Sequence, residues 1–370
     1  MTDTVEGRAI VYCEGAFSTT NGKTAHGLVR RSRRYEILAV VDSSWRRRDA
    51  GNVLDGIPAG IPIVGSVEEA VTDAAARRCP ATHLVMGLTP DGGRMPDHAR
   101  QAVVEALRLG LHVVSGLHDF LSEDPELVTL AEEHGVTLHD VRKPPDRKAL
   151  HGFTGTIESV GALRVALLGT DSAAGKRTTA WLLVDALIDR GHPAELVGTG
   201  QTAWLQGARH CIVLDSLIND FIAGEIEHAV VTAWEEERPE VIVVEGQGSL
   251  MNPAYPGGYE ILAAARPHCV VMQHVPSRRE YDGFPGYPLH SLPRQIQAVE
   301  LVSSRPVVAV TISSEGLDDE GVCRARDAMA AETGLPVVEP IRDGLEPVLA
   351  ALEPYLESRR RRDGGEEASP

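Results

Sequence analysis

The sequence predicts an α/β protein with two parallel-sheet domains, on three observations. Short apolar runs alternate with helical patterns along most of the 370 residues, which is typical of parallel β/α units. A segment rich in Pro and Gly at 142–157 interrupts the alternation. A small-residue loop joins an apolar run to a helical pattern at 169–176, as in phosphate-binding turns. We therefore expect domains at 1–145 and 161–357, a linker at 146–160, and a disordered tail at 358–370.

The composition excludes several classes of protein. The formal net charge of −17 argues against nucleic acid as a general partner, because a phosphate backbone requires a basic surface. No apolar run approaches the roughly 20 residues that span a bilayer. The five cysteines are scattered, without a Cys-x-x-Cys pair, so we expect no structural zinc and a reducing compartment. The polar, acidic start predicts no secretory leader, so a cytoplasmic location follows.

In the first domain, strand-like runs alternate with helical patterns. The expected strands are 8–13, 36–42, 61–64, 83–87, 112–115 and 136–140, and the expected helices are 68–78, 97–109 and 125–134. The first β-to-α turn keeps only Gly15 of the three glycines typical of dinucleotide sites, although Asp42 ends the second strand. We therefore expect no nicotinamide cofactor.

The second domain resumes the alternation. Its expected strands are 163–169, 194–198, 211–215, 240–245, 268–274, 306–312 and 336–339, and its expected helices include 178–190, 216–234 and 291–304. Chemistry-bearing residues follow several of these strands, and in open parallel sheets ligands bind at the carboxyl ends of strands.

The loop after the first of these strands predicts a phosphate site. Small residues let main-chain N–H groups converge on an anion, and Lys176 would reach the outer phosphates. Arg177 stands where Ser or Thr is usual, which leaves Thr178 or Thr179 as the Mg²⁺ ligand. An ordinary tight turn is the alternative. The candidate residues are Gly169, Thr170, Asp171, Ser172, Gly175, Lys176, Arg177, Thr178 and Thr179.

Glu245 ends an apolar strand, where it can bind Mg²⁺ or act as a general base. The glycine-rich turn after it, Gly246-Gln247-Gly248, offers main-chain donors for a cofactor or an oxyanion. The amide of Gln201, in the turn 198–202, can line the same site. Asp215 is either a second Mg²⁺ ligand at a strand end or part of a helix cap.

His274 ends a further strand and precedes Arg278. The histidine can take a proton, and the arginine can bind a substrate carboxylate. The loop 281–288 concentrates aromatic residues in a chain that has only 4% of them. It predicts an ordered substrate loop, with a packing role as the alternative.

Two resemblances follow from these motifs. Gly169-Thr170-Asp171 with Gly175-Lys176, and the strand-end Glu245-Gly-x-Gly, resemble the phosphate-loop ATPases that include dethiobiotin synthetase. A wider set spans most of the chain and resembles the D-glutamate N-acetyltransferase-like family, long known as a domain of unknown function. Its strings lie at 22–28, 39–42, 60–63, 169–179, 198–202, 220–224, 245–250 and 253–255. Met251-Asn252 and Gly257 to Glu260 depart from the family pattern.

The family resemblance implies a Rossmann-like N-terminal domain and a phosphate-loop NTPase-like C-terminal domain. It implies transfer of an acetyl group from acetyl-CoA to the amine of D-glutamate. For such a transfer to an acidic amino acid, the residues themselves suggest Lys176 on the CoA phosphates, Glu245 or His274 as base and Arg278 on the substrate carboxylate. We expect an enzyme of amino-acid metabolism, a homo-oligomer with a small-molecule substrate and without nucleic-acid or membrane partners.

The residues alone also fit an ATP- and Mg²⁺-dependent kinase or ligase, with Thr178, Asp215 and Glu245 around the metal. A non-catalytic nucleotide sensor is a third possibility. The loop therefore predicts a phosphate ligand and leaves CoA and ATP open.

Overall fold

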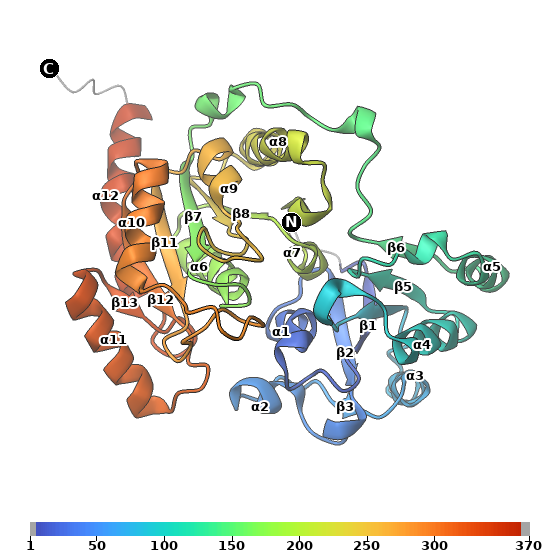
Figure 1. The fold of residues 1–370 in the computed structure, drawn as a ribbon. Helices are drawn as coiled ribbons and strands as arrows, with labels where there is room; N and C mark the ends of the chain where they lie inside the picture. Colours follow the sequence, from blue (N-terminus) through green and yellow to red (C-terminus); the bar gives the residue numbers. More distant parts are fainter. Residues whose placement is uncertain (1–4, 364–370) are drawn as a thin grey trace, which may run out of the picture. The chain divides into compact units, whose positions relative to one another are not determined.

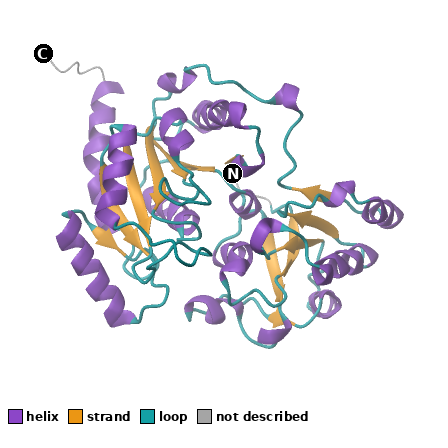
Figure 2. Ribbon diagram, in the orientation of Figure 1, coloured by secondary structure: helices purple, strands orange, loops and turns teal. Residues whose placement is uncertain are grey.

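A computed structural model describes residues 5–363 and divides the chain into two compact units. The first unit holds residues up to Pro145 together with Gln201–Ala208, and the second holds Asp146–Gly200 and the residues from Arg209 onward. Both units are α/β, with all-parallel sheets flanked by helices (Figures 1 and 2). The expected fold class is confirmed.

The first unit is built on a six-stranded sheet in the order β3-β2-β1-β4-β5-β6. Its strands are β1 Gly7–Tyr12, β2 Tyr35–Val41, β3 Ile63–Val64, β4 His83–Met86, β5 His112–Ser115 and β6 Leu138–Asp140. Its helices are α1 Lys23–Arg30, α2 Ala50–Asp55, α3 Val67–Ala76, α4 Asp97–Arg108, α5 Pro125–His134 and α7 Gln201–Gln206. This order, which reverses direction between β1 and β4, is that of a Rossmann fold. Helices α3, α4 and α5 pack in series on one face, and α1 contacts α2 and α7 on the other.

Helix α7 comes from the second half of the sequence but belongs to the core of the first unit. Leu205 is fully buried there, and Trp204 stacks on His139 with ring centroids 4.7 Å apart. The Gln206 amide donates to the main-chain oxygen of Gly27 at 2.7 Å. The chain therefore passes between the units three times.

The second unit is built on a seven-stranded sheet in the order β13-β12-β11-β7-β10-β8-β9. Its strands are β7 Leu163–Gly169, β8 Ala194–Gly198, β9 His210–Cys211, β10 Val241–Glu245, β11 Cys269–His274, β12 Val307–Ile312 and β13 Val337–Val338. Its helices are α6 Lys176–Asp189, α8 Asn219–Glu237, α9 Tyr259–Ala264, α10 Leu292–Ser303, α11 Asp319–Thr333 and α12 Glu346–Asp363. Strand β7 lies between β10 and β11, so their three carboxyl ends meet at one edge.

Three expectations about local structure are wrong. Strand β9 ends at Cys211, and Asp215 lies in a short 3₁₀ helix at Leu214–Ser216, because only His210 and Cys211 pair with β8. Helix α8 begins at Asn219, three residues later than expected, and its first turn has no side-chain cap, so Asp215 does not cap it. Residues 358–363 continue helix α12, so the expected disordered tail is helical there; 364–370 lie outside the described residues.

The segment expected to be a linker is attached to the second unit. The carboxylate of Glu227 on α8 accepts hydrogen bonds from Thr154 N at 2.6 Å and Ile157 N at 3.0 Å. These bonds stabilise the ionised carboxylate and lower the pKa of Glu227, although burial alone would raise it. Among residues 5–363, no helix is long and apolar enough to cross a membrane.

Candidate functional site

Residues 169–176, here called the phosphate loop, connect β7 to α6 and form a tight turn. Ala173 and Gly175 both have positive φ, at 46° and 103°. A Cβ on Gly169 would lie 2.8 Å from Cδ of Lys176, so the glycine lets the lysine stem cross the end of β7. Alternating turn conformations of this kind aim main-chain N–H groups into a shared concavity, as anion sites require.

Lys176 is the buried cation of this loop, with 7% of its surface exposed. Its ammonium donates to the main-chain oxygen of Asp171 at 2.6 Å and to that of Gly248 at 2.8 Å. The second bond ties the phosphate loop to the glycine-rich turn after β10. The structure thus brings together the two strongest motifs of the sequence.

Asp171 anchors the phosphate loop through a fully buried carboxylate. Oδ1 accepts from Ser172 N at 2.7 Å and from the Asn252 amide at 2.9 Å. Oδ2 accepts from Arg278 Nη1 and from Asp282 N, each at 2.9 Å. A buried carboxylate is stable when its lone pairs are bonded and its charge is paired, and both conditions hold here.

Arg278 is hydrogen-bonded to the phosphate loop, and only 7% of its side chain is exposed. Nη1 donates to Asp171 and to the oxygen of Ser172 at 2.8 Å, and Nη2 donates to the oxygen of Ala173 at 3.3 Å. Nε and Nη2 also donate to Glu315 at 2.9 and 2.8 Å. All five N–H donors of the guanidinium are thereby used, and the carboxylates raise the pKa of Arg278 although burial opposes them.

Glu245 lies buried at the end of β10, as the sequence predicts. Its Oε2 accepts a hydrogen bond from Thr199 N at 3.0 Å. Burial raises the pKa of Glu245 above its ordinary value, while the charges of Arg177 and Lys176 and the bond from Thr199 oppose that shift. A carboxyl of this kind accepts a proton more readily than an exposed one.

His274 ends β11 on the other side of the phosphate loop. Its Nδ1 shares a hydrogen bond of 2.8 Å with the hydroxyl of Thr170, which fixes the orientation of the ring. Burial, with a smaller contribution from Arg278, lowers the pKa of His274 to about 4, so the imidazole is neutral at pH 7. Next to it, Gln273 Oε1 accepts from the hydroxyls of Thr179 and Thr311, each at 2.6 Å.

Both halves of the chain match known family descriptions. Residues 44–144 match the Rossmann-like domain DUF1611_N, and residues 151–349 match the P-loop domain DUF1611_C, each described as a domain of unknown function. The chain belongs to the DUF1611 family.

Two curated relatives of this DUF1611 chain carry the name D-glutamate N-acetyltransferase. The protein from Tritonibacter scottomollicae is 30% identical over 284 residues, which is 75% of this chain and 83% of the relative. The protein from Pseudoalteromonas is 29% identical over 288 residues, with the same coverage. A crystal structure of a DUF1611 protein from Anabaena variabilis has a TM-score of 0.85 and 30% identity, and covers 94% of this chain and all of that one. The expectation of an enzyme is confirmed by the named relatives.

The remaining predicted site residues do not all lie beside the phosphate loop. Gln201 begins α7 in the first unit, where it packs against Gly116. The N–H of Gly246 donates to the oxygen of Leu167 at 2.9 Å, whereas the N–H of Gly248 makes no main-chain hydrogen bond within the described chain. The Gln247 amide donates to the hydroxyl of Thr199 at 3.0 Å. No group of three or more His, Cys, Asp or Glu in the described part of the DUF1611 chain is placed to hold a metal.

Asn252 is a site residue that the sequence reasoning missed. It joins Asp171 to the turn after β10, since its Oδ1 accepts from Ala254 N and Tyr255 N at 2.9 and 2.8 Å. The Asn-Pro dipeptide at 252–253 signals such a turn, but nothing local signals the bond to Asp171. Ser249 was also missed: its buried hydroxyl makes no hydrogen bond within the described chain, and the residue lines a narrow crevice beside Gly169.

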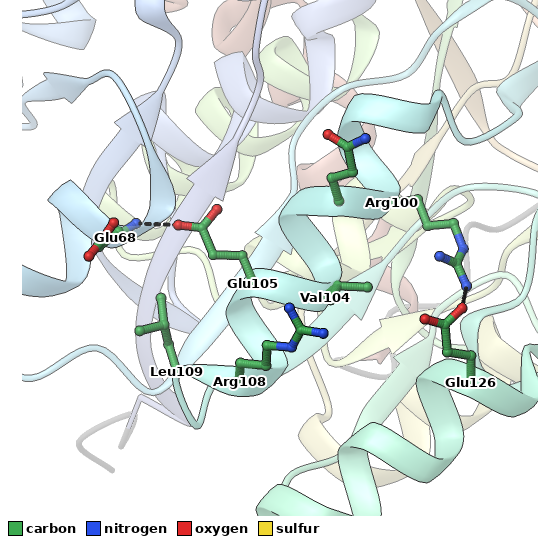
Figure 3. Close-up of a pocket in the computed structure, with 8 residues that line it drawn as sticks. Glu68, Arg100, Val104, Glu105, Arg108, Leu109 and Glu126 are labelled. Carbon is green, nitrogen blue, oxygen red and sulfur yellow. Dashed lines mark hydrogen bonds and ion pairs between the residues drawn. The ribbon is translucent and has the colours of Figure 1, made fainter.

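In the first unit, the first β-to-α turn is closed by its own contacts. The Asp42 carboxylate accepts from Phe17 N and from Ser44 N, each at 3.0 Å. A pocket of about 440 Å³ lies elsewhere in this unit, over α4 (Figure 3). Its charged residues pair among themselves, as Arg100 does with Glu126 at 2.7 Å and Glu105 with the N–H of Glu68 at 3.1 Å. None of the predicted site residues lines it.

Proposed function

We propose that this DUF1611 protein transfers an acetyl group from acetyl-CoA to the amine of an acidic amino acid such as D-glutamate. The observation that carries the proposal is the similarity to two relatives named for that reaction, over three quarters of the chain. The second unit supports the proposal in two ways. The Lys176 ammonium binds the turn that follows β10, and the buried carboxyl at the end of β10, Glu245, has a raised pKa.

The phosphate loop fits the phosphates of CoA. The Lys176 ammonium donates to two main-chain oxygens, which carry only partial charge, so a phosphate oxygen would be a stronger acceptor at the same place. The main-chain N–H groups of residues 173–176 would complete the clamp. When bound, acetyl-CoA supplies an acetyl thioester, the electrophile that the amine needs.

Glu245 is the residue that we assign to proton removal. Amide formation requires a neutral amine, so the substrate ammonium must lose a proton before a C–N bond can form. Burial raises the pKa of Glu245, which strengthens it as a base, whereas His274, with a pKa lowered to about 4, is a weak one. His274 remains neutral and oriented by Thr170, and the N–H of Gly248 is the donor left for a developing oxyanion.

Arg278 has a different role from the one that the sequence suggested. Its five donors hold Asp171, Glu315 and the phosphate loop, which leaves none for a substrate carboxylate. We assign it to holding the conformation of the loop.

The test compares ligands and then turnover. Acetyl-CoA and CoA are expected to raise the melting temperature of the native protein, because a ligand that binds only the folded state stabilises it. The Lys176→Ala variant is expected to lose that shift, and Glu245→Gln to keep the shift while losing turnover with D-glutamate. Stabilisation by ATP with Mg²⁺ and not by acetyl-CoA would overturn the proposal in favour of a kinase or ligase. Binding of acetyl-CoA without turnover across acidic D- and L-amino acids would overturn it in favour of a sensor.

A further inference from the structure

Two loops of the second unit expose aromatic rings beside each other. Tyr255 follows β10 with 53% of its surface exposed, and Phe284, half-buried, follows β11. Their ring centroids are 5.9 Å apart in an edge-to-face arrangement. Tyr287, in the same loop as Phe284, is 55% exposed. Because only 4% of the chain is aromatic, such a group at one place is unusual.

Asp171 attaches both loops to the phosphate loop, one through each carboxylate oxygen. Oδ1 binds the amide of Asn252, whose own oxygen accepts from Tyr255 N. Oδ2 binds the N–H of Asp282, two residues before Phe284. The main chain close to each aromatic residue is therefore hydrogen-bonded, directly or through Asn252, to the buried carboxylate of Asp171. These hydrogen bonds hold both loops in place relative to the phosphate loop.

A second contact ties Tyr255 to the lysine of the phosphate loop. Gly248 has φ +47°, and a Cβ at this position would lie 1.9 Å from the main-chain oxygen of Tyr255. The oxygen of the same Gly248 accepts from Lys176. The main chain of Tyr255 thus packs directly on the residue that holds the cation.

We propose that Tyr255 and Phe284 form a platform for the adenine ring of the nucleotide whose phosphates lie in the phosphate loop. The proposal rests on the phosphate role given to that loop under the proposed function, and it does not depend on acetyl transfer. Aromatic faces attract flat neutral rings and cations, and repel carboxylates, so an acidic amino acid does not suit this platform. CoA and ATP share the adenine ring and its phosphate tail.

The experiment measures dissociation constants of the full-length protein for CoA, for ATP with Mg²⁺, and for tripolyphosphate, which has no ring. Tyr255→Ala and Phe284→Ala are expected to weaken the adenine ligand by about tenfold, the effect typical of losing one stacked aromatic ring. Tripolyphosphate binding is expected to stay unchanged. Tyr255→Phe keeps the ring and should match the wild type. Phe153→Ala, at a 50% exposed aromatic outside both loops, is the matched control.

The outcomes separate this proposal from the proposed function. Wild-type affinity of Tyr255→Ala for the adenine ligand would overturn the platform and leave the phosphate clamp intact. An equal loss for tripolyphosphate would also overturn it, because the side chain would then only support the loop. A wild-type protein that binds none of the three probes would refute the clamp itself. Tighter binding of CoA or of ATP identifies the source of the adenine.

Discussion

Replacing Arg278 with Ala is expected to destabilise the second unit strongly. The substitution removes the charged partner, at 2.9 Å, of an Asp171 carboxylate that is fully buried. Removing one member of a buried ion pair costs about 3–5 kcal/mol, because the other charge stays in a medium that solvates it poorly. The pair with Glu315 adds little, since 44% of the Glu315 side chain is exposed and such pairs contribute below about 1 kcal/mol.

Urea unfolding and thermal melting check this value. For a unit of this size, the expected loss corresponds to a melting temperature lower by roughly 6–20 °C. Arg279→Ala is the matched control, because Arg279 is exposed and its side chain makes no hydrogen bond or ion pair with any described residue. It should change stability by less than about 0.5 kcal/mol.

A double variant tests the physical cause. If the cost arises from the unpaired charge of Asp171, then Asp171→Asn should cost less in the Arg278→Ala background than in the wild type. Equal stability of the Arg278→Ala and Arg279→Ala variants would refute the reasoning. Unchanged stability with a raised KM for the amino acid would restore Arg278 as a substrate ligand.

Two further predictions concern a titration and a turn. The pKa of His274 in the folded protein is about 4, below its ordinary value of 6.5. As the pH falls, the unfolded chain therefore binds a proton at this residue before the folded protein does. The stability that the neutral His274 contributes is present above pH 6.5 and is lost as the pH falls towards 4. His274→Asn should therefore show a smaller loss of unfolding free energy than the wild type across that range, and an identical slope would contradict the assignment. Gly283→Ala, at φ +80° with open space around it, should cost about 1–2 kcal/mol. Gly248→Ala should lower the free energy of unfolding more than Gly283→Ala does in the same urea assay, and it should also weaken CoA binding, because the new Cβ meets the main chain of Tyr255. Equal losses for the two variants would show that the turn at Gly248 adapts.

The sequence predicts the carboxyl edge of the second sheet well. Apolar runs of strand length end at Gly169, Glu245 and His274, and consecutive parallel strands present their ends at the same edge. The structure places these residues on the adjacent strands β7, β10 and β11. Local composition was sufficient to predict these positions, because the end of each apolar run marks the end of a strand.

Contacts between residues that are distant in the sequence could not be predicted in the same way. Two adjacent arginines, 278 and 279, have the same local pattern, yet one is buried on Asp171 and the other is exposed. The strand expected at 211–215 stops at Cys211 because pairing with β8 ends there, which an apolar run does not reveal. Helix α7 has only six residues, which is too short for a periodic pattern, and its start was expected to be a turn; nothing local says which core it completes.

That helix also has a consequence for how the protein is made. Leu205 belongs to the core of the first unit, yet the ribosome produces it only after β7, α6 and β8 of the second unit. The N-terminal half therefore waits for a late segment before its hydrophobic face against α1 is covered. A fragment cut at residue 145 would keep that face exposed and be prone to aggregation.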